Sequence, residues 1–63
     1  MTKEYLVTYI IDGISKAEQV FAQNEYRAID KIYSLENISK TYADIAIIRI
    51  DEWKSEGYCV VML

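Results

Sequence analysis

The stretch that decides the fold is Lys3–Ala22, which reads KEYLVTYIIDGISKAEQVFA. Its two halves are rich in strand-forming residues, and Asp12-Gly13 lies between them with an isoleucine on each side. An Asp-Gly pair between apolar strands is the strongest short signal for a β-hairpin, because both central residues of a type I′ turn need a positive φ. The sequence therefore predicts two antiparallel strands, Lys3 to Ile11 and Ile14 to about Ala22.

A two-residue turn also fixes which residues face each other across the hairpin. The expected pairs are Ile11 with Ile14, Tyr9 with Lys16, Val7 with Glu18, and Tyr5 with Val20. One face then carries Tyr5, Val7, Tyr9, Ile11, Ile14 and Val20, and the other carries Leu6, Thr8, Ile10, Ala17 and Phe21. Neither face is polar, whereas an antiparallel sheet with one side in water normally has a polar face.

The next segment predicts the one helix of the chain, which begins after Asn24 and ends near Glu36 to Ser39. Asn24 is a good N-cap because its side chain can accept a hydrogen bond from a free N–H of the first turn. Glu25 suits the positive end of the helix dipole. The apolar stripe consists of Ala28, Ile32 and Leu35, widened by Ile29 and flanked by Tyr26 and Tyr33.

Two more strands are expected after the helix. Four isoleucines predict a strand from Ala43 to about Glu52. The segment Trp53–Gly57 has the composition of a turn, in which Gly57 can supply an unusual backbone angle. The apolar segment Tyr58–Leu63 predicts a fourth strand that pairs with the third and is buried, with Cys59 inside it as an inert core thiol.

The element order β-β-α-β-β predicts an α+β fold with a single domain, residues 1–63. A right-handed crossover places the third strand beside the first, so the expected antiparallel sheet has the order 2-1-3-4 with the helix on one face. The sequence does not decide which face the helix covers. A helix about 10–12 Å wide shields about half of a sheet that is ~19 Å across. We expect a second copy or a target protein to cover the other face.

Size and composition also favour association. A chain of 63 residues buries only about 60% of its unfolded surface, so its stability is marginal. Its single cysteine rules out an internal disulfide, which leaves oligomerisation, partner binding or an unusually good core. The lone thiol and the absence of a signal peptide predict a cytoplasmic protein. No apolar run is long enough to span a membrane.

Few groups in this sequence could carry catalysis. There is no histidine and there are only two glycines, so the commonest general base and a phosphate-binding loop are both missing. Asp51 and Glu52 are adjacent in a strand and therefore point to opposite faces. Nothing supports a carboxylate site made from Asp12 and Asp44. We expect no enzyme activity, no cofactor and no metal site.

Recognition is the better-supported role. The six tyrosines are explained either by core packing or by a contact surface, in which aromatic residues are typical anchors. Trp53 lies in Asp51–Glu56, a segment with three carboxylates and one lysine, which is either a solvated turn or an acidic contact patch. The candidate partner-binding residues are Leu6, Ile10, Phe21, Asp51, Glu52, Trp53, Glu56 and Tyr58.

Nucleic acid is not an expected partner. The net charge is −3, whereas proteins that neutralise phosphates need a basic face. The basic residues are scattered, each with acidic neighbours: Lys3, Lys16, Arg27, Lys31, Lys40, Arg49 and Lys54. The acidity is also compatible with a surface that imitates DNA.

Several residues carry a resemblance to a known family: Tyr5, Val7 and Thr8, then Asp12-Gly13, Ala43-Asp44, Arg49 and Asp51. In this order and layout the chain resembles the uracil-DNA glycosylase inhibitor of Bacillus phages, a small, acidic, tyrosine-rich and dimeric protein with a hairpin, a helix and a strand. The chain departs from that pattern by its fourth strand and by a helix without matching contact residues. No binding residue is therefore carried over. Anti-CRISPR and anti-restriction proteins of similar size fit equally well.

The uncovered apolar area and the acidity without catalytic groups lead to the first hypothesis, a non-enzymatic binding protein. With the resemblance, it is a phage or mobile-element protein that inhibits a host nucleic-acid-acting enzyme by occupying its surface. The alternative is a homo-oligomeric structural or assembly module, whose uncovered sheet face packs against its twin. A third hypothesis is a binder of small ligands or nucleic acid. The expected partners are thus a second copy of the chain, a host protein, or both.

Overall fold

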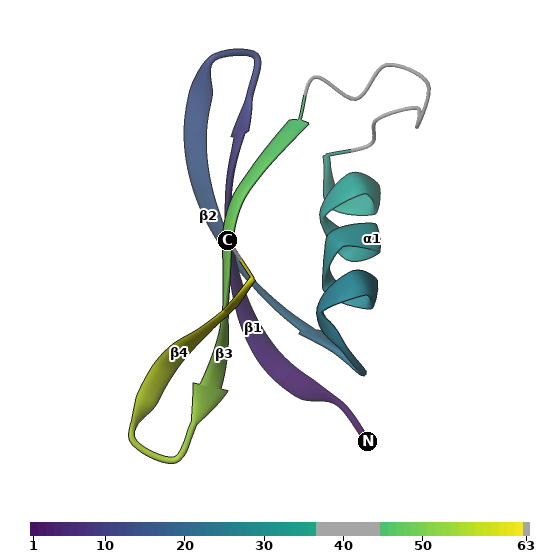
Figure 1. Cartoon of the computed structure of the whole chain (residues 1–63). Coiled ribbons are helices and arrows are strands. Elements are labelled where there is room, and N and C mark those ends of the chain that lie inside the picture. Colours follow the sequence, from purple (N-terminus) through teal and green to yellow (C-terminus); the bar gives the residue numbers. More distant parts are fainter. Residues whose placement is uncertain (37–44, 63) are drawn as a thin grey trace.

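The computed structural model describes residues 1–36 and 45–62. Its elements are β1 (Lys3–Ile11), β2 (Ile14–Ala22), α1 (Glu25–Leu35), β3 (Ile45–Lys54) and β4 (Gly57–Met62). The four strands form one antiparallel sheet in the order β2-β1-β3-β4. The predicted α+β fold, strand order and strand directions are confirmed (Figure 1).

The β1–β2 hairpin has the predicted turn and register. Asp12 and Gly13 have φ values of 51° and 77°, the positive angles that a type I′ turn requires. Ile11 faces Ile14, and the register continues without a shift to Lys3 opposite Ala22. The turn therefore sets which side chains share a face along the whole hairpin.

Helix α1 begins where the sequence predicts. The Asn24 side chain accepts a hydrogen bond from the backbone N–H of Arg27 at 2.9 Å, so Asn24 is the N-cap. Glu25 follows in the first turn, at the positive end of the helix dipole. The helix ends at Leu35, and Glu36 is its C-cap.

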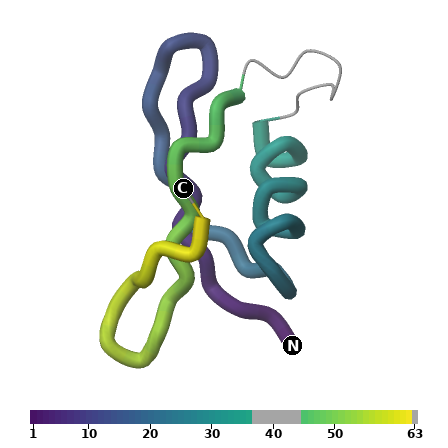
Figure 2. The backbone as a smooth tube through the Cα atoms, in the orientation of Figure 1, coloured from purple at the N-terminus to yellow at the C-terminus, as the bar shows by residue number. Residues whose placement is uncertain are grey.

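Helix α1 covers the β1–β2 half of one face of the sheet. Figures 1 and 2 show the helix on one side of the sheet, with the β3–β4 hairpin extending away from it. The buried core consists of Tyr5, Val7, Tyr9, Ile11, Ala22, Ala28, Ile32 and Ile50. The helix thus packs on the face that carries the odd-numbered residues of β1.

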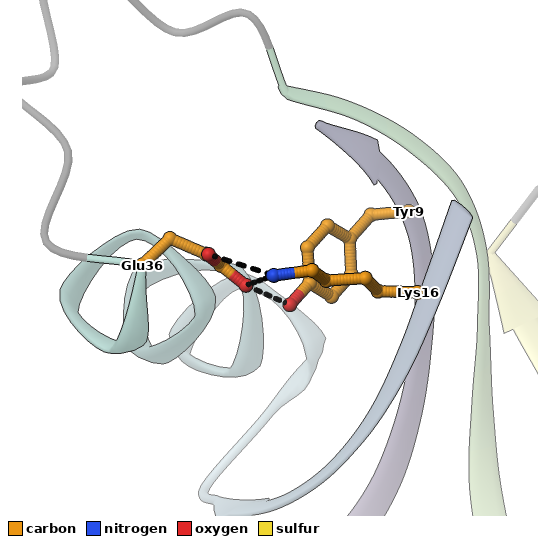
Figure 3. A network of polar contacts seen from close by, with 3 residues as sticks. All are labelled: Tyr9, Lys16 and Glu36. Carbon is orange, nitrogen blue, oxygen red and sulfur yellow. Dashed lines mark hydrogen bonds and ion pairs between the residues drawn. The ribbon is translucent and has the colours of Figure 1, made fainter. Parts of the chain in front are cut away.

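A polar cluster joins the end of α1 to the hairpin (Figure 3). The buried Tyr9 hydroxyl donates a hydrogen bond to the Glu36 carboxylate at 2.5 Å, and Lys16 Nζ lies 3.2 Å from the same carboxylate. The bond from Tyr9, followed by that from Lys16, lowers the pKa of Glu36. Burial and the bond to Glu36 raise the pKa of Tyr9. We call these three residues the helix clamp.

The predicted boundary between the third strand and its turn is wrong. Strand β3 continues through Trp53 to Lys54, so the turn contains only Ser55 and Glu56. Gly57 has a φ of 143°, an angle that side chains disfavour, and it permits this short connection. The predicted first residues of this strand, Ala43-Asp44, lie outside the described residues.

The expected burial of the last strand is also wrong. Strand β4 pairs with β3 as predicted, but Tyr58, Val60 and Val61 are exposed, and so is Cys59. The reason is the position of α1, which lies over β1 and β2 and leaves β4 uncovered. Leu63, predicted as the final strand residue, lies outside the described residues.

One residue of the predicted helix stripe is not in the core. Ala28 and Ile32 are fully buried, whereas Leu35 is 57% exposed. Leu35 lies beside Val20 and Phe21 at the outer edge of the sheet, where it lines a surface groove. The helical period is therefore as predicted, but the last position of the stripe passes beyond the edge of β2.

Candidate functional site: the open face of the sheet

The face of the sheet opposite α1, here called the open face, has no second layer among the described residues (Figure 1). Cross-strand neighbours in the register share a face, which defines the members of this surface. They are Glu4, Leu6, Thr8, Ile10, Ser15, Ala17, Gln19, Phe21, Ala46, Arg49, Asp51, Trp53, Tyr58 and Val60.

An aromatic pair lies on the β3–β4 half of the open face. Trp53 and Tyr58 are cross-strand neighbours, and their rings meet edge to face with centroids 5.1 Å apart and an interplanar angle of 73°. Trp53 is 47% exposed and Tyr58 is 39% exposed. The pair therefore holds a rigid aromatic surface in solvent, the kind of surface that protein interfaces use as an anchor.

Glu4 ties this aromatic pair to the other strands. Its carboxylate accepts hydrogen bonds from the Tyr58 hydroxyl and from the Gln19 side-chain amide, each at 2.5 Å. The bond from Tyr58, followed by that from Gln19, lowers the pKa of Glu4. The same bond raises the pKa of Tyr58. These contacts cross the sheet from β4 to β2 and limit the rotamers of Tyr58.

A buried carboxylate lies at the centre of the open face. Asp51 is only 5% exposed, between its cross-strand neighbours Leu6 and Val60. A buried charge needs a partner, and Arg49 Nε supplies one at 3.1 Å from the Asp51 carboxylate. About half of the Arg49 side chain is exposed. A partner on this face would therefore meet the guanidinium group of Arg49 rather than a free aspartate.

The structure places six of the eight predicted partner-binding residues on the open face: Leu6, Ile10, Phe21, Asp51, Trp53 and Tyr58. Glu52 does not join them, because it faces Tyr5 on the helix side and pairs with Lys54 at 3.0 Å. Glu56 is exposed in the β3–β4 turn.

Sequence reasoning missed the polar residues that order this face. Glu4, Gln19 and Arg49 were not among the predicted contact residues, although the hairpin register already placed Glu4 opposite Phe21. That register was the available signal for Glu4. The hydrogen bond from Tyr58 to Glu4 could not be predicted from a local sequence pattern, because these residues lie 54 positions apart.

The described residues give no chemical signature beyond this surface. Within residues 1–36 and 45–62, no three side chains from histidine, cysteine, aspartate and glutamate gather as a metal-binding group. In the same part of the chain, no helix has the length and apolarity that crossing a membrane requires. No protein-family model, curated protein or solved structure matches this chain.

Proposed function

We propose that this chain is a non-enzymatic binding protein of phage or mobile-element origin, which inhibits a host nucleic-acid-acting enzyme by covering part of its surface with the open face. The observation that carries the proposal is the half-exposed Trp53–Tyr58 pair on a sheet face that no other described element covers. The site of action that follows is the cytoplasm of the host cell.

Phe21 and Val60 enlarge the anchor surface, with about half of each residue exposed. Exposed aromatic and aliphatic side chains on one face favour a protein partner, because their burial is the main driving force for association. A polar frame of Glu4, Gln19 and Arg49 around them would provide specificity. This mixture of an apolar centre with a polar rim is typical of protein interfaces.

The positions of the basic residues support a protein target over nucleic acid. Among the residues that the structure describes, four basic side chains lie within 4 Å of a carboxylate: Lys16 at Glu36, Arg27 at Asp30, Arg49 at Asp51 and Lys54 at Glu52. Phosphate binding needs cations that can exchange small counterions for a phosphate. Paired cations on a chain of net charge −3 contribute little to that exchange.

The test is capture of a host enzyme and titration of the purified pair. Tagged wild-type protein is incubated with a bacterial lysate, and the captured protein is identified and purified. Its nucleic-acid-directed activity and its affinity are then measured with wild type, Trp53→Ala and Tyr58→Ala. We expect inhibition by wild type and roughly 30-fold or greater weakening by each variant, because truncation of an interface anchor costs about 2 kcal/mol or more.

The matched control is Tyr26→Ala. Tyr26 is 66% exposed but lies on α1, on the other side of the sheet, so its truncation should leave affinity unchanged. Equal weakening by the control, or unchanged affinity in both open-face variants, would contradict the proposal. If wild type captured only further copies of itself, the proposal would fail and the self-assembling module would be the better interpretation.

A further inference from the structure

The outer edge of β2 is a second surface without a partner among the described residues. Strand β2 is at the end of the sheet and has nine residues, with a continuous register against β1 and no proline. By contrast, β4 has six residues and a register shift against β3. Long, regular edges invite pairing with another chain unless a bulge, a proline or a short length prevents it.

The hairpin register tells which backbone groups reach this edge. A type I′ turn closes with a hydrogen-bonded pair, here Ile11–Ile14. Hydrogen-bonded and non-hydrogen-bonded pairs alternate along an antiparallel ladder, so every second residue after Ile14 directs its backbone to β1. The residues that direct backbone N–H and C=O groups to the free edge are Ser15, Ala17, Gln19 and Phe21.

The edge is complementary to itself in one register. If two β2 strands pair antiparallel about a two-fold axis at Ala17, Ile14 lies opposite Val20 of the second copy. Lys16, whose Nζ also pairs with Glu36 of its own chain, lies opposite Glu18 of the second copy. Opposite charges and apolar pairs directly across a ladder are stabilising, and like charges are not. The neighbouring symmetric registers centre on Lys16 or on Glu18. Each would place that charged residue opposite its own copy on the axis, so that like charges face each other.

A groove beside the edge fits the same register. It has a volume of about 500 Å³ and lies between β2 and α1, lined by Glu18, Gln19, Val20, Phe21, Lys31, Ser34 and Leu35. Because Ile14 of a second copy lies opposite Val20, its side chain reaches this groove. Ile14 is 59% exposed and Leu35 is 57% exposed, and both would be covered. Such a contact would cover Leu35, which passes beyond the edge of β2 and lies outside the core.

We propose that two copies of this chain pair through their β2 edges, antiparallel and with Ala17 at the two-fold axis. The two four-stranded sheets then form one sheet of eight strands, with both helices on the same side and both open faces on the other. This self-association goes beyond the proposed function, because it uses the β2 edge and leaves the anchors on the β3–β4 half of the open face accessible.

A cysteine at the two-fold axis tests the register. In a hydrogen-bonded antiparallel pair the Cα atoms are about 5.5 Å apart, within the range of about 4.4–6.8 Å that a disulfide spans. In a Cys59→Ser background, Ala17→Cys treated with oxidised glutathione should form a covalent dimer. Ser15→Cys, two residues from the axis, should stay uncrosslinked. Equal crosslinking of the two, or none of Ala17→Cys, overturns the register.

Edge variants test the dimer without a covalent bond. Ala17→Pro removes an outward N–H without a loss from the β1 ladder, and Ala17→Lys places like charges at the axis. By light scattering, wild type should have the mass of a dimer, and both variants should have half that mass with unchanged circular dichroism. The control Val60→Lys on exposed β4 should remain dimeric. A monomeric wild type, or dimers of both Ala17 variants, overturns the proposal and leaves the open-face proposal untouched.

Discussion

At the scale of single residues, Tyr5 and Tyr9 have the same size and burial but different hydroxyl environments. Both residues are 0% exposed. The Tyr9 hydroxyl donates to Glu36, whereas the buried Tyr5 hydroxyl has no hydrogen-bond partner among the described residues. A buried polar group without a partner has lost its hydrogen bonds to water and has gained none in the protein, so its burial is destabilising. The two tyrosines therefore contribute to stability in different ways.

We predict that the two tyrosine-to-phenylalanine variants have different effects on the free energy of unfolding. Tyr9→Phe should lower the free energy of unfolding by about 1.5–3 kcal/mol, because it removes a hydrogen bond to a charged group. Tyr5→Phe should leave it unchanged or raise it by up to about 1 kcal/mol, because an unsatisfied hydroxyl disappears. Urea denaturation followed by far-ultraviolet circular dichroism measures both. Equal destabilisation by the two variants would show that the hydroxyl environments do not differ.

Strand alternation predicted much of this residue-level arrangement. The turn at Asp12-Gly13 placed Tyr5 and Tyr9 on one face and Leu6 and Ile10 on the other, as the structure has them. The bond between Tyr9 and Glu36 joins residues 27 positions apart. No local pattern reports such a contact, because it depends on where the helix packs.

At the scale of elements, the helix clamp fixes the end of α1 to the hairpin. A carboxylate at a helix C-terminus is unfavourable with respect to the helix dipole. Glu36 holds this position, and the Tyr9 hydroxyl and the Lys16 ammonium compensate for it. The clamp therefore depends on Glu36 being ionised and Tyr9 being protonated.

This requirement predicts a pH dependence with two limits. The Glu36 pKa is lowered in the fold, so its contribution is present above its ordinary value of 4.5 and is lost as pH falls through the folded-state pKa. The Tyr9 pKa is raised, so its contribution is present below its ordinary value of 10.0 and is lost as pH rises toward the folded-state pKa. Denaturation measured at a series of pH values gives both the acid and the alkaline loss of stability.

The variant Glu36→Gln should lose less stability than wild type as the pH falls, because it has no carboxylate at this position to protonate. Glu56→Gln is the charge-matched control, because Glu56 is exposed in the β3–β4 turn and the clamp does not involve it. If wild type and Glu36→Gln lost the same stability as the pH falls, the helix clamp would not contribute to acid sensitivity.

The sequence predicted the bounds of an element correctly where a residue marked its turn or its cap. Asp12-Gly13 and Asn24 are explicit markers, and they fixed the hairpin register and the helix start. Trp53 and Lys54 carry no such marker. The sequence therefore predicted a strand that ends at about Glu52, whereas the strand continues to Lys54. The apolar composition of β4 suggested burial, but composition does not reveal that α1 covers β1 and β2.

At the scale of the whole molecule, the two unpartnered surfaces have separate roles in our proposals. The β2 edge joins two copies, and the open face binds a target. If folding and pairing are linked, stability depends on protein concentration by mass action. We predict that the thermal midpoint of wild type rises with concentration, whereas the midpoint of Ala17→Pro stays constant. A concentration-independent wild type would contradict this linkage.

The position of Trp53 gives the molecule its own optical reporter. It is the one tryptophan of the chain, half exposed on β3 and two strands away from the β2 edge. Occupation of the open face would bury the indole and shift its fluorescence emission to the blue, whereas pairing at β2 would leave the emission unchanged. Tryptophan emission can thus distinguish target binding from self-association in unlabelled protein.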